Sequence, residues 1–253
     1  MPARTSPLSS VEKACRILRS LSGAETLRLA DIASQTAINK ATALRILDTL
    51  AREGYARRAN ASKQWSLGDE AYVLGVAASA RVDIRERARA SLVRLAAMSE
   101  DTVLLSVRSG TEAVCVDREV GAFPIRANYL EIGSRRPLGI GAGSMALLAW
   151  LPDDEIEAVL RLLKGELARY PKITVRWLER EVQDSRERGY TVVIDRVVDR
   201  MAGVGVPLFG IDRRPIAALS IAALSERIAP RLPDLVAALR KEAEEITVAK
   251  GRK

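Results

Sequence analysis

The first quarter of the chain repeats apolar residues with the period of an α-helix. Three short segments of this kind follow one another, over residues 9–21, 28–36 and 40–53. The residues predicted to face inward are Val11, Ala14, Cys15 and Leu18 in the first segment, Leu29, Ile32 and Ala33 in the second, and Ala43, Ile46, Leu47 and Leu50 in the third. The three apolar faces are expected to pack together and to hold one small domain.

Local signals set the limits of these helices. Ser9 and Glu12 have the spacing of a capping box, while Asn39 is a favourable N-cap for the third helix and Gly54 is placed to end it. Beyond Gly54, "YARR" and "KQWSL" have the character of strands and are joined by the polar turn "ANAS". Three helices followed by a two-stranded ribbon predict a winged helix-turn-helix within residues 1–68.

A helix of small residues over 69–80 then separates this ribbon from a second unit. Because the linker is helical and not rich in proline and glycine, it is expected to transmit movement between the units. We place the boundary near residue 81. The expected division is residues 1–68 for the winged helix-turn-helix, 69–82 for the helical linker and 83–253 for the second domain.

From residue 102 the hydrophobic period changes to two, which is typical of strands. "TVLLSV" and "EAVCVDR" flank a Ser-Gly turn and predict a hairpin, and "YTVVID", "GVGVPLF" and "PIAALSIAA" predict later strands. Helices are predicted between the two sets, at about 142–150, 153–163 and 174–188, and a last helix near the end of the chain. Strands interrupted and followed by helices indicate an α+β domain.

Composition changes this picture in two respects. No apolar run approaches the roughly 20 residues that a bilayer span requires, and "MPARTSPLSS" lacks the apolar core of a signal peptide, so a cytoplasmic location is expected. The chain has no histidine and two cysteines, which removes a Ser-His-Asp triad, a Cys-His pair and a histidine zinc site. Catalysis through carboxylates or lysine stays open, but we predict no catalytic residue, no metal and no cofactor.

Positive charge is concentrated on the third helix and the ribbon. The net charge is +8, and residues 39–65 carry six Lys or Arg against two Asp or Glu, a net of +4. In a helix-turn-helix the start of the second helix of the motif meets base edges, while ribbon cations meet phosphates or the minor groove. The predicted DNA-binding residues are Asn39, Lys40, Thr42 and Arg45 on the helix and Arg57, Arg58 and Lys63 on the ribbon. The alternative is a winged helix used for protein contact, with these charges merely solvated.

Four segments in a fixed order give the chain a resemblance to the IclR family of bacterial transcriptional regulators. They are "IASQTAINKATALRILDTLAREGY", "PLGIGAGSMALLAWLP", "ERGY" and "GVGVPLF" with "AALSIAA", and the resemblance runs from about residue 9 to residue 225. Three positions depart from the family pattern: Ala37 stands where a turn glycine is usual, Ser144 where a lysine is common, and Gly210 where an acidic residue is frequent.

The resemblance implies a GAF-like α/β sensor domain with an antiparallel sheet, dimers formed through the DNA-binding domains, and tetramers as dimers of dimers. It also implies an effector that is a small organic acid or an aromatic catabolite. The effector-binding positions that it carries over are Gly141, Ala142, Met201, Gly203, Ser220 and Asp195, with Asp199 as the alternative acidic residue. The glycines of "PLGIGAGS" lack the GxGxxG spacing, so they indicate either tight packing or a small-anion site.

Together these observations predict a ligand-responsive regulator, expected to be a repressor, that binds a pseudo-palindromic operator in double-stranded DNA as a homodimer or homotetramer. Two alternatives remain open at this point. One is an enzyme acting on a small organic acid with an appended winged helix, which the missing histidines disfavour. The other is an architectural DNA-binding protein without an effector.

Overall fold

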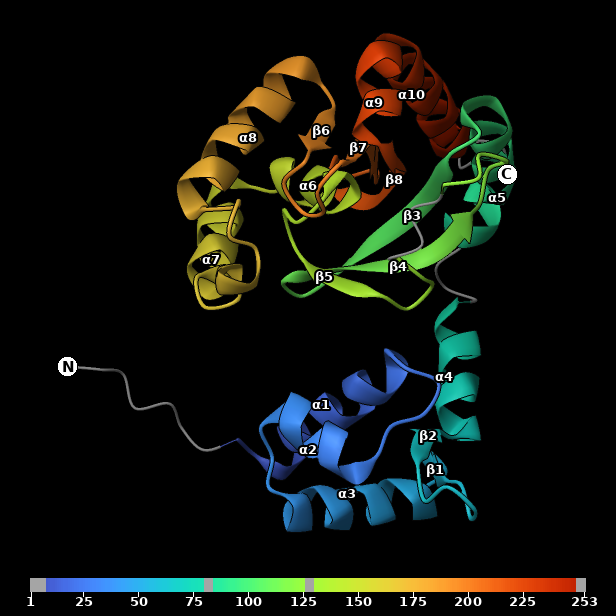
Figure 1. Ribbon diagram of the computed structural model, residues 1–253, viewed down its shortest axis with the longest axis vertical. Helices are drawn as coiled ribbons and strands as arrows, with labels where there is room; N and C mark the ends of the chain where they lie inside the picture. The colour runs from blue at the N-terminus through green and yellow to red at the C-terminus, as the bar shows by residue number, and fades with distance from the viewer. Residues whose placement is uncertain (1–7, 80–83, 126–129, 249–253) are drawn as a thin grey trace, which may run out of the picture. The chain divides into compact units, whose positions relative to one another are not determined.

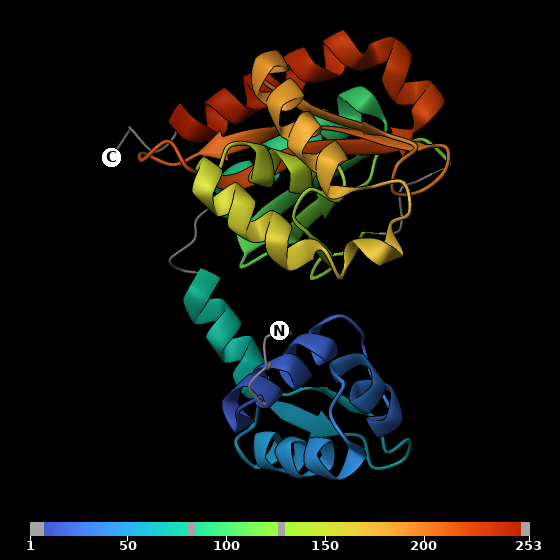
Figure 2. The ribbon, with the colours of Figure 1, turned by 90° about the vertical axis from the view of Figure 1, so that its left-hand side faces the viewer.

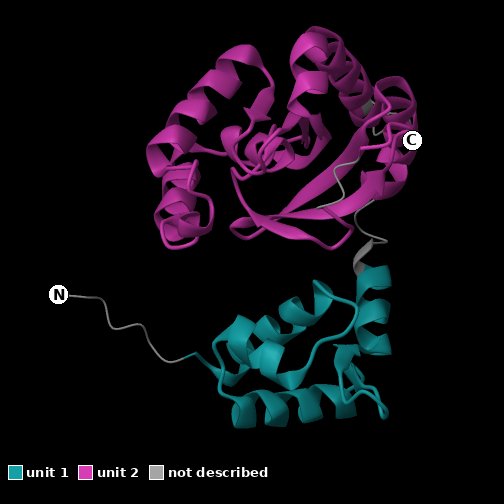
Figure 3. Ribbon diagram, viewed as in Figure 1, with its two compact units in different colours: residues 1–83 teal, residues 84–253 magenta. Residues whose placement is uncertain are grey.

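The computed structural model describes residues 8–79, 84–125 and 130–248. The chain divides into two compact units, Met1–Asp83 and Ile84–Lys253, each with its own core (Figure 3). The sequence also predicts Asp83 as the N-cap of the helix that follows it, but this residue lies outside the described residues. Each unit is described by itself.

Unit 1 has the predicted order of three helices, a two-stranded ribbon and a further helix (Figure 1). Its elements are α1 (Ser10–Ser22), α2 (Leu29–Thr36), α3 (Lys40–Arg52), β1 (Ala56–Arg58), β2 (Trp65–Leu67) and α4 (Asp69–Ser79). The core includes Ile17, Leu21, Ile32, Leu47 and Trp65, each at most 2% exposed. Helix starts and ends follow the predicted signals, because Ser9 and Glu12 form the capping box and Gly54 has a φ of 76° just after α3.

The prediction of the inward-facing residues of α1 is wrong: the residues that face the core lie about one turn later in the sequence than the predicted ones. Val11 is 72% exposed and Cys15 is exposed, whereas Ile17 and Leu21 are buried. Ala14, Ile17, Leu18 and Leu21 satisfy the same i, i+3, i+4, i+7 spacing as the predicted set. The core takes the set that buries more aliphatic surface, since the hydrophobic contribution grows with the apolar area removed from water.

The turn between α2 and α3 holds a left-handed alanine. Ala37 has φ 55° and ψ 34°, and the backbone N–H of Ile38 donates to Ala33 O at 3.2 Å to close the helix. A left-handed conformation costs a residue with a Cβ about 1–2 kcal/mol relative to the right-handed one. Because alanine occupies the left-handed position at which the family usually has glycine, the backbone of this turn is strained.

We expect Ala37→Gly to raise the free energy of unfolding of unit 1 by about 0.5–1 kcal/mol, because relief of the left-handed strain exceeds the added entropy of the unfolded chain. Native-state hydrogen exchange of α2 and α3 amides in the full chain measures this effect. The matched control is Ala41→Gly, on the exposed side of α3, where the same replacement should lower stability by about 1 kcal/mol. Equal effects of the two replacements would contradict the account of the turn.

Unit 2 is built on one antiparallel sheet of six strands in the order β5-β4-β3-β8-β7-β6. Its strands are β3 (Thr102–Ser109), β4 (Glu112–Glu119), β5 (Arg135–Pro137), β6 (Thr191–Ile194), β7 (Met201–Phe209) and β8 (Pro215–Leu224). The central strands β7 and β8 are buried along most of their length and are apolar almost throughout, as a strand covered on both faces requires. The predicted α+β class with an antiparallel sheet is confirmed.

Helices cover both faces of this sheet (Figures 1 and 2). The helical elements are α5 (Ile84–Ser99), α6 (Ala142–Ala149), α7 (Asp153–Leu163), η1 (Leu167–Arg169), α8 (Val175–Arg188), α9 (Ser225–Ile228), η2 (Ala229–Arg231) and α10 (Leu232–Val248). One core lies between the sheet and α5 with α10, and a second core gathers α6, α7 and α8 on the opposite face. The short helix α6 is buried over its whole length, so its first turn is enclosed between the sheet and α8.

Candidate functional site

The outward side of α3 carries polar residues that are held in place by the helix cap. Asn39 is the N-cap and its side chain accepts a hydrogen bond from the Thr42 backbone N–H at 2.8 Å. Lys40 and Arg45 are exposed, while Ala43 and Leu47 anchor the other side of the helix in the core. The cap fixes the first turn, so the side chains that follow it are presented on a rigid element.

The two arginines of the ribbon lie on opposite faces. Arg58 is directly opposite Trp65 and Arg57 is opposite Ser66 in the β1–β2 register, and directly opposed residues share a face. The Arg58 guanidinium lies 5.5 Å from the centre of the Trp65 ring, a cation–π arrangement at the edge of the core. Lys63 is exposed in the turn with a φ of 56°. Arg57 therefore faces away from the core, whereas Arg58 also supports the ribbon.

These cations are available to an external anion. No ion pair joins Lys40, Arg45, Arg57, Arg58 or Lys63 to a carboxylate within the described parts of the chain. A charge without an internal partner retains its full attraction for phosphates. The arrangement of α3 and the ribbon is suited to a polyanion.

A run of large apolar side chains is exposed on α4. Tyr72, Val73, Leu74 and Val76 are 75%, 53%, 54% and 51% exposed. An exposed apolar surface of this kind is a candidate for contact with another protein surface.

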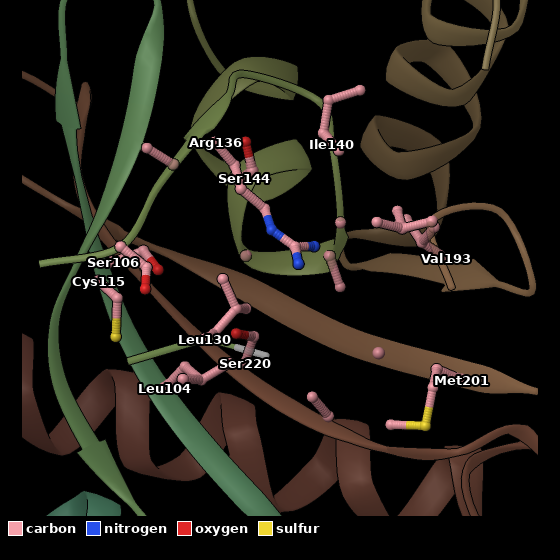
Figure 4. Close-up of a pocket in the computed structure, with 18 of the residues that line it drawn as sticks. Leu104, Ser106, Cys115, Leu130, Arg136, Ile140, Ser144, Val193, Met201 and Ser220 are labelled. Atoms are coloured by element: carbon pink, nitrogen blue, oxygen red, sulfur yellow. The ribbon is translucent and has the colours of Figure 1, made fainter. Parts of the chain in front are cut away.

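In unit 2 a cavity lies between the sheet and the first turn of α6, with a free volume of about 60 Å³ (Figure 4). Residues from all six strands and from α6 line it, together with the segments on either side of β5 and the segment that joins β6 to β7. The lining includes five residues singled out in the sequence, namely Gly141, Ala142, Met201, Gly203 and Ser220. The fold thus brings these segments together around one space.

Close packing fixes the start of α6 against the sheet. A Cβ added to Gly143 would come within 2.8 Å of Ser220 Oγ, and one added to Gly203 within 3.2 Å of Ala142 Cβ. The Thr191 hydroxyl donates to Ala142 O at 2.8 Å. Gly141, the N-cap, has a φ of 96°, which favours glycine. Because these glycines have no Cβ, α6 can approach the sheet closely. The first turn of α6 therefore forms part of the cavity wall.

The cavity has a positive end. Among the described residues that line it, Arg136 from β5 is the one that is charged, and its guanidinium Nη1 lies 3.7 Å from the position that a Cβ on Gly141 would take. The first backbone N–H groups of a helix lack intrahelical partners and favour anions. The hydroxyl hydrogen of Ser144 is not available to a ligand, because it is donated to Pro137 O at 2.8 Å. The arrangement can bind a carboxylate between Arg136 and the start of α6.

The other end of the cavity is apolar. Leu104, Cys115 and Ala222 form a small buried cluster against which Leu130 and Met201 pack. Burial raises the pKa of the Cys115 thiol to about 11, so the group is protonated at neutral pH. A protonated thiol is a poor nucleophile, and Cys115 contributes a soft apolar surface.

The acidic residues that the resemblance places near the effector are not among the described residues that line the cavity. Asp195 does not line it, and its carboxylate accepts a hydrogen bond from the Ser225 hydroxyl at 2.6 Å. The alternative, Asp199, pairs with Lys172 and is 81% exposed. Asp195 has a left-handed backbone with φ 53° directly after β6, and both acidic residues are exposed.

Sequence reasoning missed Arg136, the residue that gives the cavity its charge. It belongs to β5, a three-residue edge strand without apolar alternation, which pairs with β4. The available signal was the pair of arginines directly before "PLGIGAGS", five residues from Gly141. Among the described residues no group of three potential metal ligands occurs. Among the described residues, no helix combines the length and the apolar character that crossing a membrane requires.

Comparisons with known proteins agree over most of the chain. The model of the bacterial transcriptional regulator IclR C-terminal domain matches residues 76–248, and that of the IclR helix-turn-helix domain matches residues 10–59. The HTH-type transcriptional regulator KipR of Bacillus subtilis (strain 168) is 31% identical over 242 residues, which is 94% of this chain and 95% of that protein.

Solved structures show the same fold. A crystal structure of an IclR transcriptional regulator from Alicyclobacillus acidocaldarius has 27% identity and a TM-score of 0.78, and the match covers 96% of this chain and 99% of that one. An IclR homologue from Microbacterium hydrocarbonoxydans, crystallised as a complex with 4-hydroxybenzoate, has 21% identity and a TM-score of 0.74, covering 95% and 98% of the two chains.

Proposed function

This chain belongs to the IclR family of bacterial DNA-binding transcriptional regulators, and we propose that it is a repressor whose binding to DNA is controlled by a small organic acid. The relatives that it matches are regulators, so the protein is a regulator and not an enzyme with an appended winged helix. The observation that carries the proposal is the set of exposed cations on α3 and the ribbon, which have no ion-pair partner among the described residues.

We assign DNA binding to residues 1–68. The proposed contacts are Asn39, Lys40, Thr42 and Arg45 on α3 and Arg57, Arg58 and Lys63 on the ribbon. Support comes from the fixed first turn of α3 and from the exposure of these cations. In this arrangement α3 enters the major groove, and the ribbon contacts the backbone of the duplex.

Dimerisation through unit 1 accounts for the exposed apolar side chains of α4. A twofold dimer would present two copies of α3 to a pseudo-palindromic operator in a cytoplasmic protein. Residues 69–82 would then form both the linker and part of the dimer contact, and residues 83–253 would bind the effector and mediate assembly to tetramers.

We expect Leu74→Glu to raise the dimer dissociation constant at least tenfold, because a carboxylate would be buried in an apolar contact. Analytical ultracentrifugation of the full chain measures this constant. Leu162→Glu places the same substitution at a 69% exposed leucine of α7 and should leave the unit 1 dimer intact. A dimer unaffected by Leu74→Glu would exclude this face of α4 as the contact.

The proposed effector site is the cavity at the start of α6. The proposed effector contacts are Gly141, Ala142, Met201, Gly203 and Ser220, with Arg136 added as the cation for a carboxylate. Asp195 stays a prediction from the resemblance, although it does not line the cavity. The structural neighbour from Microbacterium hydrocarbonoxydans carries 4-hydroxybenzoate, itself a carboxylate. An acid that binds one arrangement of the dimer more tightly than another would shift the population of the DNA-binding form.

Selection of bound DNA from a random pool, with and without organic acids, tests the proposal. The expected result is an enriched sequence with two related half-sites whose recovery falls when the effector is present. Enrichment that no acid changes would indicate an architectural DNA-binding protein, and no enrichment at all would contradict the DNA-binding assignment.

A further inference from the structure

The segment that joins β6 to β7 forms one wall of the cavity. This β6–β7 strap consists of residues 195–200, with the sequence "DRVVDR". Its two central residues, Val197 and Val198, line the cavity, while the four charged residues on either side of them are exposed. Val193 and Met201, which flank the strap in the chain, line the same cavity (Figure 4). The strap therefore combines an apolar contribution to the cavity wall with a charged outer surface.

One lysine holds the charged surface of the strap from outside. Lys172, in the segment before α8, pairs with the Asp199 carboxylate, and its ammonium group also donates to Asp195 O at 3.1 Å. Arg196 Nη1 donates to Lys172 O at 3.2 Å. The Arg196 guanidinium also lies 5.3 Å from the centre of the Trp177 ring of α8. Lys172 thus contacts residues near both ends of the strap.

A second set of contacts joins the strap to the start of α9. The Ser225 hydroxyl donates to Asp195 Oδ1 at 2.6 Å, and the Ser225 backbone N–H donates to Arg200 O at 2.9 Å. Arg200 also pairs with Glu226 at 3.8 Å. Ion pairs between exposed side chains stabilise a structure only weakly. These contacts can therefore hold the strap in place without fixing it permanently.

The backbone of the strap opposes the arrangement that the outer contacts hold. Asp195 and Arg200, its first and last residues, have φ angles of 53° and 61°, a conformation that is unfavourable for a residue with a Cβ. Among the described residues, no backbone N–H of residues 196–200 donates to a backbone carbonyl, whereas β7 and β8 are paired along their length. A segment with few backbone hydrogen bonds opens more readily than the sheet beside it.

We propose that the β6–β7 strap is a gate of the cavity and that Lys172 is the latch that keeps it closed. Release of Lys172 lets residues 195–200 move outward about their two left-handed ends, which removes Val197 and Val198 from the cavity wall. This inference deepens the proposed function and rests on it, because it names how a ligand enters the proposed effector site. The rates at which a ligand enters and leaves then depend on how often the strap opens.

The two cysteines of the chain allow the gate to be tested without any effector. Cys115 lines the cavity and is 4% exposed, whereas Cys15 is exposed in unit 1. Methyl methanethiosulfonate converts an accessible thiol into a methyl disulfide, and mass spectrometry of peptides from the full-length protein gives the rate at each cysteine in one sample. Burial raises the pKa of the Cys115 thiol to about 11, so we expect it to react at least about tenfold more slowly than Cys15.

Replacement of the latch should open the cavity to the reagent. We expect Lys172→Ala to raise the rate at Cys115 about three- to tenfold and to leave the rate at Cys15 unchanged. Lys164→Ala is the matched control, because Lys164 is also an exposed lysine of unit 2 and has no ion pair within the described residues. Lys172→Glu combined with Asp199→Lys restores a pair with exchanged charges and should return the rate to within about twofold of the original.

Hydrogen exchange distinguishes opening of the strap from loosening of unit 2 as a whole. The backbone N–H of Met201 donates to Val198 O, and that of Ser225 donates to Arg200 O. In Lys172→Ala both amides should exchange at least threefold faster, while the amides of β8 that pair with β3 should exchange at the original rate.

Several results would overturn the inference. They are modification of Cys115 as fast as that of Cys15 in the original protein, an unchanged rate in Lys172→Ala, an equal increase in Lys164→Ala, no recovery in the charge-exchanged variant, and equal acceleration of exchange in β8. Failure of the proposed function is recognised separately, because these measurements contain neither DNA nor an effector. If the strap opens as expected but no acid changes DNA binding, the gate stands and effector control of DNA binding fails.

Discussion

Replacing Arg45 with alanine is expected to weaken binding to the selected operator by about 1–3 kcal/mol and to remove the preference at one base pair. Arg45 is exposed on α3, opposite the buried side that Ala43 and Leu47 anchor, and it has no ion-pair partner within the described residues. Its guanidinium can bond guanine O6 and N7 together, which a shorter or uncharged side chain cannot do. Fluorescence anisotropy with the operator and with single-base variants measures both effects.

Arg45→Lys provides the matched control for this experiment. Lysine retains the charge but loses the planar pair of donors, so the base preference should fall while most of the salt-dependent affinity remains. Arg57→Ala should behave differently from Arg45→Ala, since its side chain lies on the outer face of the ribbon. It should weaken binding to all sequences alike and reduce the salt slope by about one. An Arg45→Ala protein with unchanged affinity and base preference at physiological salt would mean that α3 does not read bases.

Arg58 needs a separate interpretation, because it has a structural contact as well as a charge. Its guanidinium stacks on Trp65, which is 1% exposed in the core of unit 1. A loss of DNA affinity in Arg58→Ala therefore combines a lost phosphate contact with a looser ribbon. Arg57, which has no such aromatic contact, gives a cleaner measure than Arg58 of what the ribbon contributes electrostatically.

The helices and the ribbon of unit 1 could be predicted because their signals are local. Asn39 bonds to a backbone group three residues away, and the left-handed Gly54 ends α3 within one turn. The inward face of α1 could not be chosen in the same way. Two overlapping sets of residues have the required spacing, and only packing against α2 and α3 selects Ile17 and Leu21 over Val11 and Cys15.

The cavity was predictable only in part, for a related reason. Gly141, Ala142, Met201, Gly203 and Ser220 were located through the resemblance of their segments to a family, and the fold places all five around one space. The charge of that space comes from an edge strand of three residues, which has no sequence period of its own and forms through pairing with β4. The predicted acidic residue, Asp195, lies in the turn after β6, and no hydrophobic period fixes the direction of its side chain.

The largest effect on stability is expected from Asp101, whose side chain is 1% exposed. Its carboxylate accepts a hydrogen bond from Arg227 Nε at 2.9 Å and pairs with Arg231, so it ties the end of α9 and η2 to the turn between α5 and β3. Both guanidinium groups also donate to Ser99 O. The Arg227 guanidinium is further stacked 3.6 Å from the centre of the Phe123 ring.

Asp101→Ala is expected to lower the free energy of unfolding of unit 2 by about 2–4 kcal/mol. Asp101→Ala removes the buried partner that Arg227 and Arg231 share and leaves Arg227 with only its pair to the exposed Glu100 at 3.6 Å. Partial exposure of the two arginines keeps the loss below that of a fully buried pair. For a unit of this size the corresponding fall in melting temperature is about 6–12 °C by differential scanning calorimetry. Glu226→Ala removes an exposed pair with Arg200 at 3.8 Å and should change stability by less than about 0.5 kcal/mol. Similar melting temperatures for the two variants would show that Asp101 is not the anchor of α9, because burial is the main difference between the two ion pairs.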